Sequence, residues 1–139
     1  MRSVQNQNFS NIEIIIIDDG SMDNSIKVIK ELMKEDDRIK LIRNFENRGT
    51  LYSKARGILN AKGKYVMTVD HDDLDTRNNV FSILFKEAEK YNLDLLEFAS
   101  NICSVETKYL NRESYISYLK TFIIKKPNIK KRFLIYNIK

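Results

Sequence analysis

Acidic side chains follow two apolar segments of this 139-residue chain, and they are the residues best suited to chemistry. Asp18 and Asp19 follow a run of four isoleucines, and Asp70, Asp72 and Asp73 follow KYVMTV. Two like charges about 4 Å apart repel by roughly 4 kcal/mol at an effective dielectric constant near 20, so protonation or a cation must relieve such a cluster. Mg²⁺ and Mn²⁺ prefer oxygen ligands and leave positions for phosphate oxygens. A metal-assisted site for an anionic ligand is therefore the predicted chemistry.

Strand-like apolar segments alternate along the chain with segments of helical periodicity. The expected strands cover 12–18, 38–43, 64–70 and 93–99, and the expected helices cover 24–36, 50–61, 77–91 and 111–125. This alternation is typical of a parallel sheet with crossover helices, so the predicted fold class is α/β. Ligands of open parallel sheets bind beyond the carboxyl ends of the strands, which is where the acids occur.

Each acidic motif also has a purely structural explanation. Asp-Asp-Gly-Ser at 18–21 can be a turn that caps a helix, and Asp-x-Asp at 70–72 is common in loops. Their joint occurrence at the ends of two apolar strands favours a binding site.

The charge of the chain is unevenly distributed. The formal net charge is +5, but residues 1–100 carry 15 basic and 17 acidic residues, whereas residues 101–139 carry 9 and 2. A basic tail with interspersed apolar residues suits peripheral contact with an anionic membrane. The alternative, which we favour, is that the apolar residues pack beneath the sheet and the charges are solvated. Nucleic acid is not an expected partner.

The length and the remaining composition indicate one intracellular domain. No apolar run approaches the roughly 18 to 20 residues of a membrane-spanning helix, and the first residues lack the features of a signal peptide. Cys103 is the only cysteine and cannot form an internal disulfide. The expected location is the cytoplasm, with membrane association through the tail as an alternative.

The segments SVQNQNFSNIEIIIIDDGSMDNS and NRGTLYSKARGILNAKGKYVMTVDHDD resemble the nucleotide-sugar-binding half of family 2 glycosyltransferases. The resemblance covers roughly residues 3–100 and implies a GT-A fold, a Rossmann-like α/β sandwich. We expect its nucleotide-sugar-binding part over 1–100, followed by a basic, partly helical extension over 101–139. It also implies an enzyme that uses Mn²⁺ or Mg²⁺ and transfers a sugar from a nucleotide diphosphate donor, most often a UDP-sugar, to an acceptor hydroxyl.

The resemblance carries roles over to individual residues. The implied nucleotide-binding residues are Asp18, Asp19, Gly20, Ser21, Arg56 and Asp70. The implied metal ligands are Asp72, Asp70 and Asp73. In the family pattern Asp19 lies near the base, Asp70 near the ribose and Asp72 on the metal. Gly57 stands where the family usually has Asn after its Arg, and no residue can be assigned as the catalytic base.

Two parts of the family pattern are missing from this sequence. The family's opening strand is absent, which would leave a vacant slot between the strands expected at 12–18 and 64–70 or require the sheet to rearrange. The acceptor-binding half, with its catalytic carboxylate, is also absent. The alternatives to an enzyme are a non-catalytic protein that binds a nucleotide or tethers a partner and, more remotely, a phosphoacceptor receiver domain in which Asp70 is phosphorylated.

Overall fold

The computed structural model describes residues 1–70, 77–98, 121–125 and 135–138 of the chain. The helices are α1 (Arg2–Gln5), α2 (Ser25–Glu35), α3 (Thr50–Asn60) and α4 (Val80–Lys90). The strands are β1 (Ile14–Asp18), β2 (Ile39–Arg43), β3 (Tyr65–Val69), β4 (Leu95–Phe98), β5 (Thr121–Lys125) and β6 (Ile135–Ile138). These elements confirm the four expected strands before residue 100 and the three expected helices there, with ends that shift by up to three residues.

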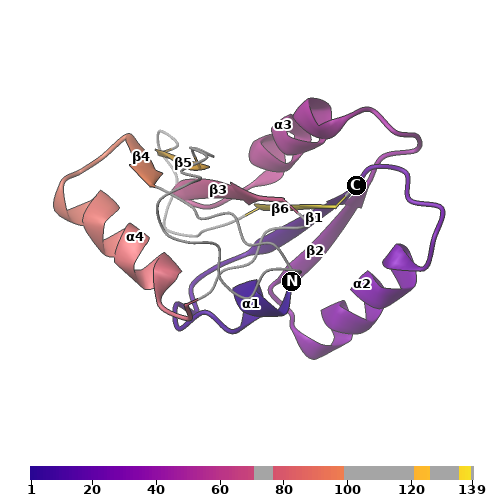
Figure 1. Ribbon diagram of the computed structural model, residues 1–139, viewed down its shortest axis with the longest axis horizontal. Coiled ribbons are helices and arrows are strands. Elements are labelled where there is room, and N and C mark those ends of the chain that lie inside the picture. The colour runs from indigo at the N-terminus through magenta and orange to yellow at the C-terminus, as the bar shows by residue number, and fades with distance from the viewer. Residues whose placement is uncertain (71–76, 99–120, 126–134, 139) are drawn as a thin grey trace, which may run out of the picture.

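The described strands form one sheet in the order β2-β1-β6-β3-β5-β4 (Figure 1). Strand β1 pairs in parallel with β2 and β6, and β3 pairs in parallel with β6. Strand β5 is antiparallel to both β3 and β4. The predicted α/β class with a mainly parallel sheet is therefore confirmed.

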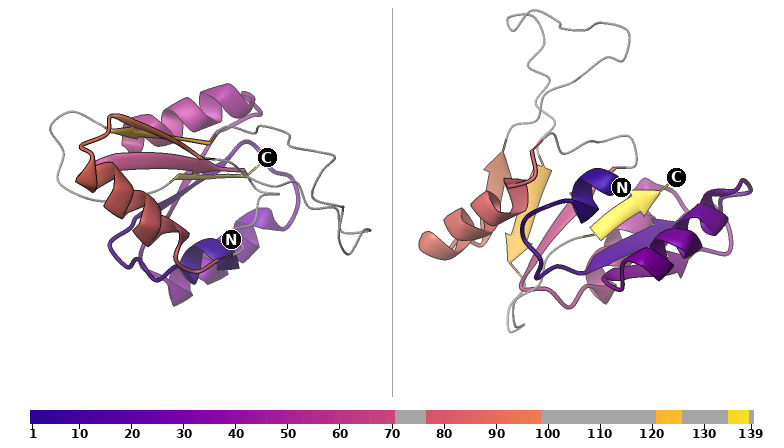
Figure 2. Two further views of the ribbon diagram at one scale, coloured as in Figure 1. Left: turned by 60° about the vertical axis from the view of Figure 1, so that its left-hand side comes forward. Right: turned by 90° about the horizontal axis from the view of Figure 1, so that it is seen from below.

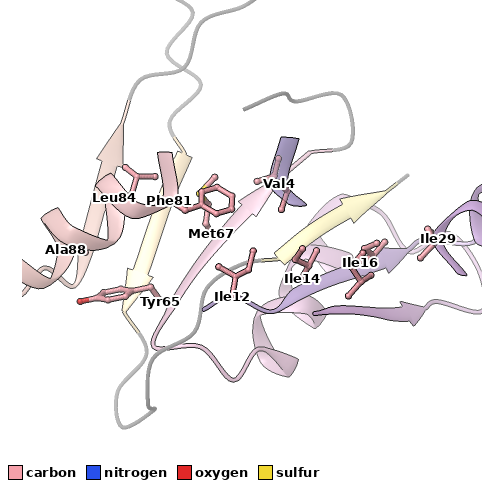
Figure 3. Close-up of a cluster of buried hydrophobic side chains, with 12 residues drawn as sticks. Val4, Ile12, Ile14, Ile16, Ile29, Tyr65, Met67, Phe81, Leu84 and Ala88 are labelled. Atoms are coloured by element: carbon pink, nitrogen blue, oxygen red, sulfur yellow. The ribbon is translucent and has the colours of Figure 1, made fainter. Parts of the chain in front are cut away.

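Helices cover both faces of this sheet. Helix α3 lies on one face, and α1, α2 and α4 lie on the other (Figures 1 and 2). Ile14 and Ile16 belong to the larger apolar cluster with Phe81 of α4 (Figure 3), whereas Ile15 and Ile17 belong to the smaller cluster on the α3 face. Since successive side chains of a strand point to opposite faces, burial on both sides accounts for the unbroken isoleucine run of β1.

The helix expected over 111–125 is wrong for its last five residues. Residues 121–125 form β5, while residues 111–120 lie outside the described part of the chain. The sequence TFIIK contains three β-branched residues, which favour strands, and β5 receives backbone partners from β3 on one side and β4 on the other. Both β5 and β6 join the sheet built by the earlier strands; the division of the chain at residue 100 stays a prediction.

Strand β6 occupies the slot that was expected between β1 and β3. It lies between β1 and β3, and its Tyr136 is in register with Ile16 on one side and with Val69 on the other. The backbone N–H and C=O groups of β1 and β3 that face the slot therefore have a parallel partner strand, which avoids the cost of leaving them unpaired. The expected outcomes were a vacant slot or a rearranged sheet. The slot is filled, because a later segment of the chain completes the sheet.

None of the helices in the described residues has both the length and the apolar character needed to cross a membrane.

Candidate functional site

Asp18 is the last residue of β1 and is completely buried. Its two carboxylate oxygens accept hydrogen bonds from the backbone N–H of Ser21 and from Nε of Arg43, each at 3.1 Å. The carboxylate therefore closes the turn that follows β1 and ties it to the end of β2. Both interactions join protein groups, so Asp18 has a structural task in this site.

Asp19 is only 4% exposed and is the anchor of the loop that follows β2. Its Oδ1 accepts from Asn44 Nδ2 at 2.6 Å and from the backbone N–H of Arg48 at 2.9 Å, and its Oδ2 accepts from the backbone N–H of Gly49 at 2.9 Å. Burial by itself would raise the pKa of Asp19, but hydrogen bonds from Arg48, Asn44, Ser53 and Gly49 outweigh it and lower the pKa. The side chain is thus a buried carboxylate stabilised by donors.

Gly20 allows the same loop to approach the turn closely. Its φ is +84°, in the left-handed region that favours glycine. A Cβ at this position would lie 2.9 Å from the backbone nitrogen of Asn47 and 3.0 Å from the carbonyl carbon of Glu46. Asp19 and Gly20 therefore join the Asp-Asp-Gly-Ser turn and the Asn-x-Gly loop into one unit, here named the first acidic corner and defined as residues 18–21 with 44–49.

The hydroxyl of Ser21 is left without a partner in this corner. Its Oγ is buried and makes no hydrogen bond within the part of the chain that the structure describes. Buried polar atoms in native proteins nearly always have a partner, which can be protein, water or ligand. The buried hydroxyl of Ser21 is therefore a candidate to bond with a ligand of the first acidic corner.

Arg56 is placed in the network behind the first acidic corner. Its Nη1 donates to the backbone carbonyl of Arg43 at 2.7 Å and to the side-chain oxygen of Asn44. The amide group of Asn44 in turn donates to Asp19 and, at 2.8 Å, to Ser53 Oγ. Sequence reasoning missed Asn44. Its position directly after a predicted strand, at the same edge as the acids, was the available signal.

Asp70 forms the second acidic corner, directly after β3, and differs from the first in exposure. Its side chain is 42% exposed, and its Oδ2 accepts from Nζ of Lys54, on α3, at 3.0 Å. Sequence reasoning required a cation near the acids but did not identify Lys54, which lies on the expected helix two residues before Arg56. Asp72 and Asp73 lie outside the described residues.

The sheet brings the two corners to the same edge. Because Ile16 and Val69 are both in register with Tyr136, the next residues, Ile17 and Asp70, lie at the same level of the sheet. Strands β1 and β3 are separated by β6 alone, which places them two strand spacings, or roughly 10 Å, apart. Helix α3 also links the corners, since Asp19 binds the residues at its start and Lys54 binds Asp70.

Asp70 is the one implied metal ligand that lies within the described residues. A partly exposed carboxylate offers the oxygen donors that Mg²⁺ and Mn²⁺ take, so Asp70 fits as one ligand. No group of three or more histidine, cysteine or acidic side chains that could hold a metal occurs among the residues that the structure describes. The other two implied ligands, Asp72 and Asp73, lie outside the described residues.

Nearly the whole chain is similar to known glycosyltransferases. A family model described as glycosyl transferase family 2 matches residues 1–137. Glycosyltransferase GlyG of Streptococcus pneumoniae is 34% identical over 90 residues, which are 65% of this chain and 30% of that protein. A Campylobacter jejuni protein named GalNAc(5)-diNAcBac-PP-undecaprenol beta-1,3-glucosyltransferase is 33% identical over 133 residues, 91% of this chain and 42% of that protein. The chain thus spans less than half the length of these relatives.

Proposed function

This chain belongs to glycosyl transferase family 2, and we propose that it forms the donor-binding part of an enzyme that transfers a sugar from a nucleotide diphosphate sugar to an acceptor hydroxyl. The observation that carries this proposal is the placement of two acidic corners at one sheet edge, one buried and one open, roughly 10 Å apart. The base at the first corner and the diphosphate at the second would span such a separation, with the ribose between them and within reach of Asp70.

The first acidic corner receives the nucleoside in this proposal. Asp18 and Asp19 shape this corner: Asp18 accepts from Arg43 at the end of β2, and Asp19 holds the following loop through Arg48 and Gly49. Ser21 is the candidate for direct contact, since its buried hydroxyl needs a partner. Arg56 supports the corner through Asn44. Contact of Asp19 or Arg56 with the nucleotide itself stays a prediction.

The second acidic corner receives the diphosphate. Asp70, with Asp72 and Asp73, would hold Mn²⁺ or Mg²⁺ against the phosphate oxygens. A bound cation supplies Lewis-acid stabilisation of the charge on the departing diphosphate. Asp70 would orient this end of the donor, and Lys54 adds a positive charge beside it. A base that takes the proton of the acceptor hydroxyl has not been assigned.

The relatives suggest where a search for substrates should begin. One relative is named as a beta-1,3-glucosyltransferase of an undecaprenol-linked glycan, so UDP-glucose and a lipid-linked acceptor are reasonable first substrates. A lipid-linked acceptor would also suit membrane contact through the basic residues 101–139. The family match favours the transferase over a receiver domain, and binding of a nucleotide without transfer is the second candidate function.

The decisive experiment is a calorimetric titration with UDP, GDP, ADP and CDP in the presence and absence of Mn²⁺. We expect one nucleotide to bind, with an affinity that Mn²⁺ raises at least tenfold. Asp72→Asn should remove most of the metal-dependent part. Asp37→Asn should not, because Asp37 is exposed and precedes β2, at the opposite end of the parallel strands from the two corners. Unchanged metal dependence in Asp72→Asn would refute its assigned role.

Sugar transfer is tested separately from binding. UDP-glucose and a short lipid-linked acceptor, incubated with the chain and Mn²⁺, should yield UDP and an extended acceptor that mass spectrometry detects. Tight nucleotide binding without any product from a panel of UDP-sugars would favour the non-catalytic alternative. Absence of binding by every nucleotide would overturn the proposed function as a whole.

A further inference from the structure

Lys54 stands between the two acidic corners and is the feature from which a further role can be inferred. It lies on α3, and its Nζ is 3.0 Å from Oδ2 of Asp70. The side chains of Lys54 and Asp70 are 28% and 42% exposed, so solvent reaches both. This ion pair can therefore separate when a ligand binds without leaving a buried charge unpaired.

The position of Lys54 is fixed by the first acidic corner. Asp19 binds the backbone N–H of Gly49, directly before α3 begins. Lys54 follows Gly49 by five residues, or roughly 7.5 Å of helical rise, and its side chain reaches Asp70 at the end of β3. A ligand that extends from the first corner to the second would pass close to this ammonium group.

The ion pair between Lys54 and Asp70 should change when a divalent cation binds Asp70. Without a cation, the ammonium of Lys54 is a counter-charge of Asp70. A divalent cation at Asp70 would compete for the same carboxylate and repel the ammonium. A diphosphate at the cation offers several anionic oxygens, and a lysine ammonium binds such oxygens as a compact point charge.

We propose that Lys54 is a phosphate-binding residue of this site. In the ligand-free protein its ammonium group is paired with Asp70. When a divalent cation binds Asp70, the ammonium group binds the donor diphosphate instead. This inference rests on the proposed function, because it assigns the diphosphate end of that donor. It adds a second positive charge, supplied by the protein, to the charge that the cation supplies.

The experiment compares ligands that share a base and differ in phosphate number. Uridine, UMP, UDP and inorganic pyrophosphate are titrated in saturating Mn²⁺ into the wild-type chain, Lys54→Met and Lys54→Arg. We expect Lys54→Met to weaken UDP and pyrophosphate about tenfold, UMP less, and uridine not at all. Lys54→Arg, which keeps the charge, should recover most of the affinity. Mn²⁺ alone should bind Lys54→Met two- to threefold more tightly, since a competing cation is gone.

Lys34→Met is the matched control, because Lys34 forms an exposed ion pair with Glu31 at 2.9 Å on α2, away from the proposed site. It should bind every probe like the wild type. Lys54→Gln, measured in parallel, replaces Lys54→Met if the latter does not fold as judged by circular dichroism.

Two results would overturn the inference. One is an equal loss of affinity for uridine and UDP, which a purely structural brace would cause; the other is unchanged pyrophosphate binding in both Lys54→Met and Lys54→Gln. Failure of the proposed function looks different. In that case no nucleoside phosphate binds better than pyrophosphate. The affinity for pyrophosphate can still be compared between the wild type and the Lys54 variants.

Discussion

The two acidic corners use the same residue type at equivalent strand ends for different tasks. In the first, Asp18 and Asp19 are buried and accept hydrogen bonds from backbone N–H groups and from Arg43 and Asn44. In the second, Asp70 is partly exposed and forms an ion pair with Lys54. An acidic motif after a strand can therefore build a loop, and exposure sets Asp70 apart from the two carboxylates that do so.

The difference should appear most clearly in stability. Asp19→Ala would remove the acceptor of the Arg48 N–H, one of the two acceptors of the buried Asn44 amide group and one of the two acceptors of the Gly49 N–H. We expect the free energy of unfolding to fall by about 3 kcal/mol, because an unpaired buried donor costs about 1–3 kcal/mol. Urea denaturation followed by circular dichroism measures this, with Asp37→Ala as an exposed control. A loss below about 1 kcal/mol would mean that Asp19 does not anchor the loop.

Close packing within the first corner can be separated from backbone strain by two glycine variants. Gly20 and Gly49 share a φ of +84°, but only a Cβ at Gly20 would meet neighbouring backbone, at 2.9 Å. Gly49→Ala should cost about 1 kcal/mol from the unfavourable φ, and Gly20→Ala about 2–3 kcal/mol because the loop must also move. Thermal unfolding of both variants gives the difference; equal costs would show that the loop does not rest on Gly20.

Acid sensitivity should follow the hydrogen-bonded carboxylates. Asp36 provides the clearest case: hydrogen bonds from Arg38 lower its pKa from 3.8 to about 2 despite its burial. A lowered pKa in the folded state stabilises the protein above pH 3.8, and this contribution, about 2 kcal/mol, is lost as the pH falls toward 2. The lowered pKa of Asp19 acts in the same direction.

Asp36→Asn tests this assignment, since it should flatten the fall in stability between about pH 4 and pH 2. Denaturant midpoints measured across that range for wild type and variant give the comparison. An unchanged pH profile would show that other groups dominate acid unfolding.

The smallest effect on stability is expected at the open corner. Asp70→Asn removes one ion pair whose partners are both solvent-accessible, and such pairs contribute about 0–1 kcal/mol. Nucleotide affinity in Mn²⁺ should nevertheless fall at least tenfold if Asp70 is a ligand-facing carboxylate. Chemical denaturation and calorimetry on the same sample measure both quantities. A large loss of stability with intact affinity would reverse the roles assigned to the two corners.

Much of the fold could be predicted because local pattern and tertiary structure agree before residue 100. The isoleucines of β1 and the periodic apolar residues of α4 each satisfy one simple rule of burial. The prediction failed at residues 121–125, where the apolar residues also fit a helical period and the choice of β5 depends on pairing with β3 and β4. Strand pairing over long sequence separation is not encoded in the local pattern of either partner.

Periodicity and the order of segments sufficed to predict the α/β class and the residue types at the carboxyl ends of β1 and β3, and the resemblance of short motifs indicated the family. Only the tertiary structure decided that Asp19 faces a loop, that Lys54 reaches Asp70, and that β6 completes the sheet between the two corners. The physical reason is that a carboxylate takes whichever donors surround it. Those donors come from residues 16 to 30 positions away, which only the folded chain brings near.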